Sequence, residues 1–170
     1  MYARHEEYSA TVNAPAEQLF AHLDDHTRLS SHMSERSWKM GWGKMDTVLD
    51  AQHGQAIGSH IVLSGRVFGI RLYLDEIVTL REPPTRKYWE TVGEPHLLVV
   101  GPYRMGFDLT PDGEECRLRV VIDYNLPPED ATRWLGEVFG DWYARWCTRQ
   151  MVQDARQTFA RARESRTEPR

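Results

Sequence analysis

The sequence lacks the features that mark a secreted, membrane-spanning or nucleic-acid-binding protein. Its two cysteines, Cys116 and Cys147, lie far apart and outside any CxxC pair, which argues against a disulfide framework and a zinc ribbon. The residues after Met1 are too polar for a signal peptide, and no apolar run approaches the roughly 20 residues of a membrane span. The net charge of −4 provides no basic field for nucleic acid. We therefore expect a protein of the reduced cytoplasm, with no membrane span and no nucleic-acid partner.

The length of the chain indicates a single domain with a substantial core. Of its 170 residues, 41% are hydrophobic and a further 12 are glycine, which is ordinary for a globular protein. Residues 161–170 carry four arginines against two glutamates. We therefore predict one domain over residues 1–160, followed by a flexible, solvated, arginine-rich tail over residues 161–170.

The start of the chain predicts a strand followed by two short helices. Side chains alternate toward the end of residues 2–13, as in a strand, and Pro15 suits the first position of a helix. The hydrophobic stripe of this helix consists of Leu19, Phe20 and Leu23. Asp24 and Asp25 oppose the helix dipole at a C-terminus, so the helix should end there, and one of them can cap a second short helix over residues 26–33.

The middle of the chain, residues 45–125, predicts about six further strands joined by hairpin-like turns. In residues 103–109 and 116–124 every second residue is hydrophobic, and a Pro-Asp-Gly turn at 111–113 separates the two runs. In residues 70–80 the apolar face comprises Ile70, Leu72, Leu74, Val78 and Leu80, and Glu76 interrupts it. The pattern indicates an antiparallel sheet.

From Glu129 to about Arg163 the pattern becomes helical. Its main apolar stripe, which we expect to be core, consists of Leu135, Val138, Phe139, Trp142 and Trp146. A helix of this length is longer than a strand of ten residues. It should therefore either break near Gly136 or Gly140 or project beyond the sheet. With the strands, it indicates an α+β fold with helices on one face of the sheet.

Two passages and the terminal helix resemble the START-like (SRPBCC) superfamily, which includes polyketide cyclases and many lipid carriers. Residues 11–25, TVNAPAEQLFAHLDD, are similar to its opening strand, Ala-Pro turn and helix, and residues 76–91, EIVTLREPPTRKYWET, to its strand–Pro-Pro–Arg–strand passage. The resemblance covers about residues 3–160. It implies a helix-grip fold, in which a curved antiparallel sheet of six or seven strands surrounds the C-terminal helix and leaves a cavity. No cofactor is expected.

The resemblance implies that apolar side chains line this cavity. The segment around Trp42 is rich in tryptophan and methionine, and we interpret it either as a cap on the core or as a pliable cover for the cavity. The stripe on the last helix can serve as core and ligand wall at once. The predicted ligand-binding residues are Met33, Trp38, Met40, Trp42, Met45, Trp89, Tyr103, Met105, Phe107, Leu135, Phe139 and Trp142.

Three of the seven histidines lie in residues 22–33, HLDDHTRLSSHM. A metal site built from them is disfavoured, because the expected helix break separates His22 from His26 and no HExxH motif or cysteine partner supports them. We predict instead that they lie at exposed helix ends, with His32 near the cavity mouth, and that no metal is bound.

Three functions are consistent with these patterns, because the superfamily hosts binders, transporters and enzymes. The leading hypothesis is binding or transport of a hydrophobic or aromatic small molecule. The alternative is a cyclase/dehydratase-type enzyme, for which the candidate acid–base groups are Glu76, Asp108, Arg104, Tyr103 and His60. The third is an interaction module or homodimer that uses an exposed tryptophan patch.

The enzyme hypothesis depends on the surroundings of Glu76. Buried in an apolar pocket, its carboxyl would have a raised pKa and could act as a general acid or base. In the more ordinary arrangement it would form an ion pair with Arg66 or Arg71 at the sheet surface. The sequence therefore assigns no catalytic residue.

Overall fold

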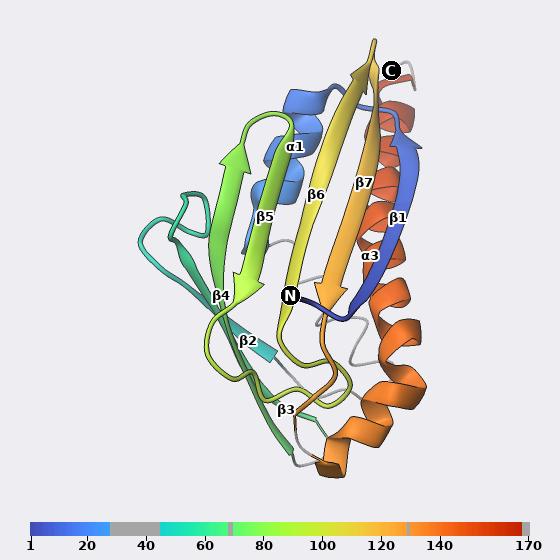
Figure 1. The fold of residues 1–170 in the computed structure, drawn as a ribbon. Helices are drawn as coiled ribbons and strands as arrows, with labels where there is room; N and C mark the ends of the chain where they lie inside the picture. Colours follow the sequence, from blue (N-terminus) through green and yellow to red (C-terminus); the bar gives the residue numbers. More distant parts are fainter. Residues whose placement is uncertain (28–44, 68–69, 129, 168–170) are drawn as a thin grey trace.

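The computed structural model of the protein describes residues 1–27, 45–67, 70–128 and 130–167, which form a sheet and two helices packed against it (Figure 1). The helices are α1 (Ala16–Asp24) and α3 (Asp130–Thr167). The strands are β1 (Arg4–Val12), β2 (Met45–Leu49), β3 (His60–Val67), β4 (Ile70–Glu82), β5 (Arg86–Thr91), β6 (Tyr103–Asp112) and β7 (Glu115–Tyr124). The described strands form one seven-stranded antiparallel sheet in the order β1-β7-β6-β5-β4-β3-β2. The predicted α+β helix-grip fold is confirmed.

The hairpin of β6 and β7 forms the middle of the core, as its alternation predicted. Gly113 has a φ of 63° in the turn, a conformation that glycine adopts without a steric cost. The inner face, meaning the face toward α1 and α3, receives from β6 and β7 the side chains Tyr103, Met105, Phe107, Leu109, Cys116, Leu118, Val120, Ile122 and Tyr124. The opposite, outer face carries their polar neighbours.

Helix α1 ends where the paired aspartates predicted. Asp25 is its C-cap, with an extended backbone, and its Oδ1 accepts a hydrogen bond from the Thr27 amide at 3.0 Å. Phe20 packs edge-on against Phe107 of the sheet, with ring centroids 5.6 Å apart. The second short helix expected over residues 26–33 lies almost wholly outside the described residues.

Helix α3 is continuous from Asp130 to Thr167, which rules out the first of the two alternatives, a break near Gly136 or Gly140. These glycines instead permit close packing, because a Cβ at Gly136 would lie 2.6 Å from Pro127 Cδ, and one at Gly140 would lie 3.2 Å from the Val99 carbonyl. At 1.5 Å per residue the helix is about 57 Å long. None of the helices that the structure describes combines the length and apolar composition that a membrane crossing requires. The boundary between the domain and its arginine-rich tail stays a prediction.

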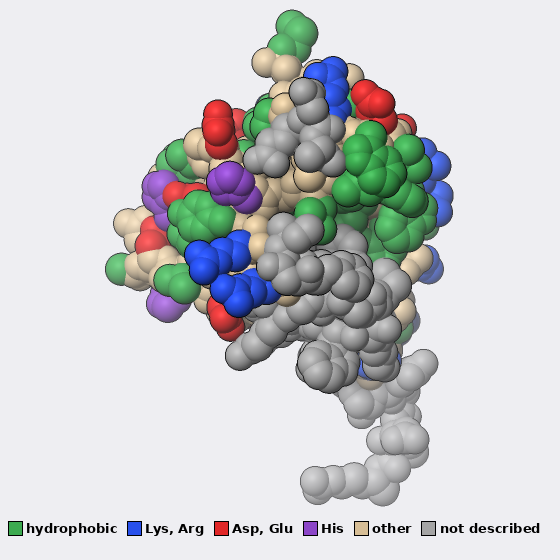
Figure 2. Space-filling view, turned by 90° about the horizontal axis from the view of Figure 1, so that it is seen from below, with side chains coloured by type: hydrophobic (Ala, Val, Ile, Leu, Met, Phe, Trp, Pro, Cys, Tyr) green, Lys and Arg blue, Asp and Glu red, His purple; other side chains and the backbone are tan. Residues whose placement is uncertain are grey.

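The face of α3 that packs on the sheet differs from the one expected. Its buried residues are mostly small: Gly136, Gly140, Ala144, Thr148, Met151, Val152 and Ala155. Three of the five residues predicted as core are instead exposed, with Val138 at 63%, Phe139 at 44% and Trp142 at 55%. Trp134 beside them is 57% exposed, whereas Leu135 and Trp146 are partly buried. Hydrophobic side chains gather at the end of the molecule where α3 begins (Figure 2). Small residues face β1 and β7 because the helix axis lies close to these strands.

A β-bulge in β4 corrects the expected face of Leu80. The pairing with β5 shifts between Val78, which opposes Trp89, and Leu80, which opposes Tyr88. The extra residue reverses the alternation, so Leu80 turns to the outer face and Arg81 turns inward. The bulge therefore adds a charged side chain to an otherwise apolar face.

Candidate functional site

The centre of the inner face holds a buried hydrogen-bonded pair, Glu76 and Tyr103. Glu76 lies on β4 and Tyr103 on β6, and between them β5 places Thr91, which pairs with Glu76 and whose Oγ1 accepts a hydrogen bond from the Tyr103 amide. Because Thr91 is small, the Tyr103 hydroxyl reaches across β5 and donates a hydrogen bond to Glu76 Oε1. The ion pair of Glu76 with Arg66 or Arg71 that the sequence left open does not form, because Glu76 is buried on the inner face.

Burial raises the pKa of Glu76 to about 7, although hydrogen bonds from Tyr103 and Trp89 lower it. Burial also raises the pKa of Tyr103 well above 10, and the Glu76 charge adds to that effect. The phenol therefore stays protonated and serves as a donor. The carboxyl populates both protonation states near neutral pH, which suits it to accept or donate a proton.

Trp89 connects this pair to His26. It lies on the same face of β5 as Thr91, is 4% exposed, and its ring packs edge-on against the His26 imidazole with centroids 5.2 Å apart. The expectation that His26 lies at an exposed helix end is wrong, since it is 5% exposed. The extended backbone of Asp25 ends the helix one residue earlier, and His26 follows inside the protein.

A buried charge cluster lies beside His26. Lys87 is fully buried, and its Nζ donates hydrogen bonds to Asp24 Oδ1 at 2.6 Å and to the Gly54 carbonyl at 2.7 Å. Arg81, turned inward by the bulge, donates to Asp24 Oδ2 at 2.8 Å. Burial raises the pKa of Asp24, but the hydrogen bonds from Arg81 and Lys87 outweigh it and hold that pKa below its usual value. The cluster fastens the end of α1 to the sheet.

Helix α3 contributes Tyr143 and Cys147, which lie one turn apart and near Tyr103 of the sheet. The interaction with Cys147 and burial raise the pKa of Tyr143 well above 10, and burial raises the pKa of Cys147 to about 12. Yet both side chains keep partly accessible surface. Both groups lie near Tyr103, whose pKa their charges also raise.

The hydrophobic core of the described residues consists of two clusters. One cluster packs α1 and the second half of α3 against β5 to β7, and another packs Ala144 against Leu74, Tyr103 and Tyr124. Met105, at the middle of the inner face, touches both clusters and remains only partly buried. Met105 therefore links the two clusters of the described core.

The predicted ligand-binding residues are distributed unevenly. Trp89, Tyr103, Met105 and Phe107 come together on the inner face. Leu135 is partly buried near the start of α3, whereas Phe139 and Trp142 are exposed. Outside the described residues lie Met33, Trp38, Met40 and Trp42, together with the side chain of Met45. Ligand contact by any of these residues stays a prediction.

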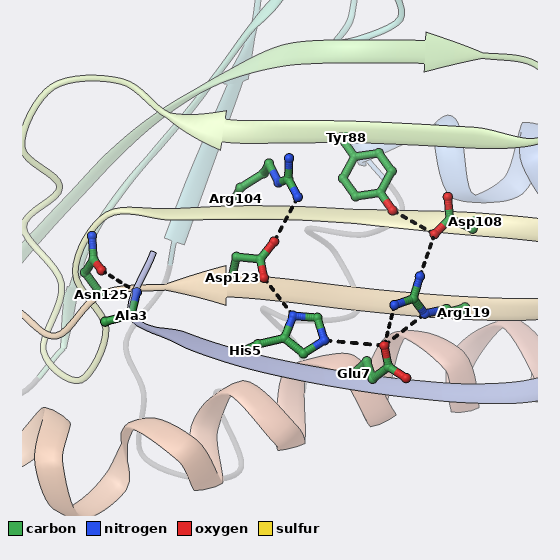
Figure 3. Close-up of polar contacts among 9 residues, drawn as sticks. All are labelled: Ala3, His5, Glu7, Tyr88, Arg104, Asp108, Arg119, Asp123 and Asn125. Carbon is green, nitrogen blue, oxygen red and sulfur yellow. Dashed lines mark hydrogen bonds and ion pairs between the residues drawn. The ribbon is translucent and has the colours of Figure 1, made fainter. Parts of the chain in front are cut away.

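The remaining acid–base candidates lie on the outer face, away from Glu76. There a polar chain crosses four strands (Figure 3), formed by Tyr88, Asp108, Arg119, Glu7, His5, Asp123 and Arg104. Arg104 donates to Asp123 at 3.0 Å and stacks over Tyr88, and Asp108 accepts from Tyr88 at 2.7 Å. These charges are already paired and serve to hold the strands together.

An open hollow of about 470 Å³ lies beside this chain, lined by Thr79, Leu80, Arg86, Tyr88, Glu90, Arg104 and Asp108. His60, the last candidate, pairs with Asp75 at 2.9 Å, and about half of its side chain is exposed. Within the described residues no group of three or more His, Cys, Asp or Glu side chains is arranged to hold a metal ion.

Sequence reasoning missed the polar neighbours of the inner site. His26 was considered only as a metal ligand, Asp24 only as the end of a helix, and Lys87 was not singled out. The alternation of side chains along β5 did indicate the position of Lys87, because it places Lys87 on the same face as Trp89 rather than on the outer face with Tyr88.

The fold is shared by several solved structures, at sequence identities that show the fold alone. A protein from Thermus thermophilus superposes with a TM-score of 0.66 at 12% identity, over 94% of this chain and 99% of its own. Norcoclaurine synthase from Thalictrum flavum, solved with dopamine and hydroxybenzaldehyde, has a TM-score of 0.59 at 13% identity, over 98% and 89% of the two chains. A protein from Arthrobacter aurescens has a TM-score of 0.62 at 12% identity, over 92% and 86%.

No curated protein matches this chain closely enough to count as a relative. The sequence profile described as "Polyketide cyclase / dehydrase and lipid transport" does match, over residues 4–163. That match spans all the strands and almost the whole of α3, including every residue of the inner site. The chain therefore belongs to the polyketide cyclase/dehydrase and lipid transport family.

Proposed function

We propose that the protein binds a hydrophobic or aromatic small molecule between the inner face of the sheet and α3. The observation that carries the proposal is the position of the partly buried Tyr143, Cys147 and Met105 around the buried Glu76–Tyr103 pair. Burying apolar ligand surface there would supply affinity at about 25 cal/mol per Å² before the costs of association. Glu76 would orient the ligand by one hydrogen bond.

Native mass spectrometry of the protein purified without denaturation, followed by titration with aromatic and acyl compounds, tests the proposal. Ligand entry should change the fluorescence of Trp89. The variant Met105→Trp should fill the space and abolish binding, whereas Val48→Trp, on the exposed edge strand, should leave it unchanged. A protein that retains no molecule and responds to no compound refutes the proposal, as does equal binding by both variants.

A cyclase/dehydratase activity is the second candidate, favoured by the pKa of Glu76 near 7 beside a neutral phenol. An ionised Glu76 could remove a proton from carbon next to a carbonyl, and the protonated form could return it to a departing hydroxyl, which leaves as water. Incubation with a poly-β-carbonyl substrate, followed by product analysis, tests this. Loss of turnover with retained binding in Glu76→Gln would support an enzyme, and binding of such a substrate without turnover would identify a carrier.

Two coarser expectations also stay proposals. A cytoplasmic location rests on the reduced cysteines, and localisation of a tagged protein tests it. A homodimer would have the exposed face of α3 available, made of Trp134, Val138, Phe139 and Trp142. Light scattering over a range of concentrations tests this: a mass near 19.8 kDa throughout would exclude the dimer.

A further inference from the structure

The hollow on the outer face of the sheet has an apolar middle that the strands themselves build. A Cβ at Gly106 would collide with the ring of Tyr88, so the glycine allows that ring to lie over β6. The Tyr88 hydroxyl donates to Asp108 at 2.7 Å, which fixes the direction of the ring (Figure 3). On β4 the bulge turns Leu80 outward. Tyr88 and Leu80 therefore both line the open hollow of about 470 Å³.

Four charged side chains also line the hollow, and two of them belong to the polar chain of the outer face. Arg104 donates to Asp123 at 3.0 Å. Asp108 accepts hydrogen bonds from Tyr88 and from Arg119. Burial raises the pKa of Tyr88 to about 12, so the phenol stays neutral. The charges of Arg104 and Asp108 are therefore balanced within the sheet.

The other two charged side chains, Arg86 and Glu90, lie outside that chain. Arg86 donates to Glu82 at 2.7 Å through Nε, and its two terminal nitrogens have no hydrogen-bond partner among the described residues. Glu90 forms no hydrogen bond or ion pair with any described residue, although Arg104 lies opposite it in the pairing of β5 with β6. The hollow therefore presents one guanidinium and one carboxylate that can bind groups from outside the chain.

Arg86 and Glu90 lie toward opposite ends of the hollow. They point to the same face of β5 and are four residues apart, so their Cα atoms are separated by about 13 Å at 3.3 Å per residue. Tyr88 lies between them on that face, and Leu80 lies opposite Tyr88 on β4. A ligand that reaches both charges must therefore cross an apolar middle.

We propose that the hollow binds an elongated zwitterion, whose carboxylate pairs with Arg86 and whose ammonium pairs with Glu90, through an apolar chain that covers Leu80 and Tyr88. A ligand with a single charge would satisfy only one of the two ends. An unbranched ω-amino acid and a short extended peptide with free ends share this chemistry. The hollow lies on the opposite face of the sheet from the proposed inner site, and binding there does not depend on that site.

Chemical-shift mapping by NMR on the intact protein tests the inference. The probes are ω-aminooctanoate, trialanine and, as a short control, γ-aminobutyrate. At roughly 10 mM, the two long probes should shift the backbone amide signals of residues 79–80, 86–90 and 104–108, because exposed ion pairs supply little affinity. The short control cannot reach both charges and should bind about twofold to fivefold more weakly. Tighter binding of trialanine than of ω-aminooctanoate would favour a peptide as the ligand, and the reverse order an amino acid.

Two variants and two matched controls assign the contacts. Glu90→Gln and Arg86→Gln should each weaken the binding of ω-aminooctanoate about twofold to fivefold, as expected for one exposed ion pair. Glu115→Gln and Arg117→Gln remove the same charges from β7, outside the hollow, and should leave the affinity unchanged. Equal affinities of all four variants, no shift with any probe, or shifts confined to the inner face each overturn the inference. These results leave the proposed function intact, because Met105→Trp tests the inner site separately.

Discussion

Replacement of Glu76 by glutamine should remove a specific pH dependence of stability. The folded protein holds this carboxyl at a pKa of about 7, against an ordinary value of 4.5. The folded state therefore binds an extra proton between these values, and the stability contributed by the protonated acid is full below pH 4.5 and lost as the pH rises through 7. The glutamine variant keeps an oxygen for the Tyr103 hydroxyl but cannot ionise.

The size of this change in stability follows from the folded and ordinary pKa values of Glu76. Their difference corresponds to roughly 3 kcal/mol, of which about 2.5 kcal/mol falls between pH 5 and pH 8. The free energy of unfolding of the wild type, measured by urea denaturation, should therefore decline relative to Glu76→Gln by that amount. For a protein of this size the melting temperatures should diverge by roughly 5–10 °C.

A matched control separates this effect from general acid sensitivity. The control variant is Glu82→Gln, which removes a carboxylate that pairs with Arg86 on the surface. Its pH dependence of stability should stay close to that of the wild type. If the stability curves of wild type and Glu76→Gln run parallel from pH 5 to pH 8, Glu76 ionises like a solvated acid, and the acid–base argument for the inner site is wrong.

Three further substitutions test the neighbouring contacts. Tyr103→Phe removes only a hydroxyl and should cost about 1–3 kcal/mol, with the larger cost at pH 8, where its acid partner is ionised; equal costs at pH 5 and pH 8 in urea denaturation would contradict this. Asp24→Asn leaves Lys87 buried without a counter-charge and should cost about 3–5 kcal/mol by the same assay, whereas combining it with Lys87→Met should recover much of the loss. Gly54→Ala and Gly113→Ala both strain a left-handed backbone by about 1 kcal/mol. Only at Gly54 would the new Cβ also lie 2.9 Å from the buried His26 ring, so Gly54→Ala should melt at the lower temperature. Equal melting temperatures for the two variants would disprove that contact.

The interior strands could be read from the sequence because alternation is a local property. The inward residues of β6 and β7 follow from residues two apart pointing to one face, and nothing in the fold disturbs that period. The period failed in β4, where the bulge moves Leu80 outward and Arg81 inward. A bulge is decided by pairing with β5, and a single strand considered alone does not show it.

The face of α3 was misread for a different reason. Hydrophobicity alone favours burying Phe139 and Trp142, but the helix axis approaches β1 and β7 so closely that small residues such as Gly140 and Ala144 fit there instead. Which face of a helix is buried depends on the distance to its partner as much as on its composition.

What the sequence determined by itself was the order and type of the described elements, the end of α1 at Asp24 and Asp25, and the presence of an acid on an apolar strand face. These follow from propensity, capping and period, which act within a few residues. Only the tertiary structure decided that Glu76 meets Tyr103 across Thr91, and that His26 and Lys87 lie inside beside Trp89. Such pairs come from different strands and from a loop, and their burial, which shifts the pKa values of Glu76 and His26, exists only once the sheet and helices have closed around them.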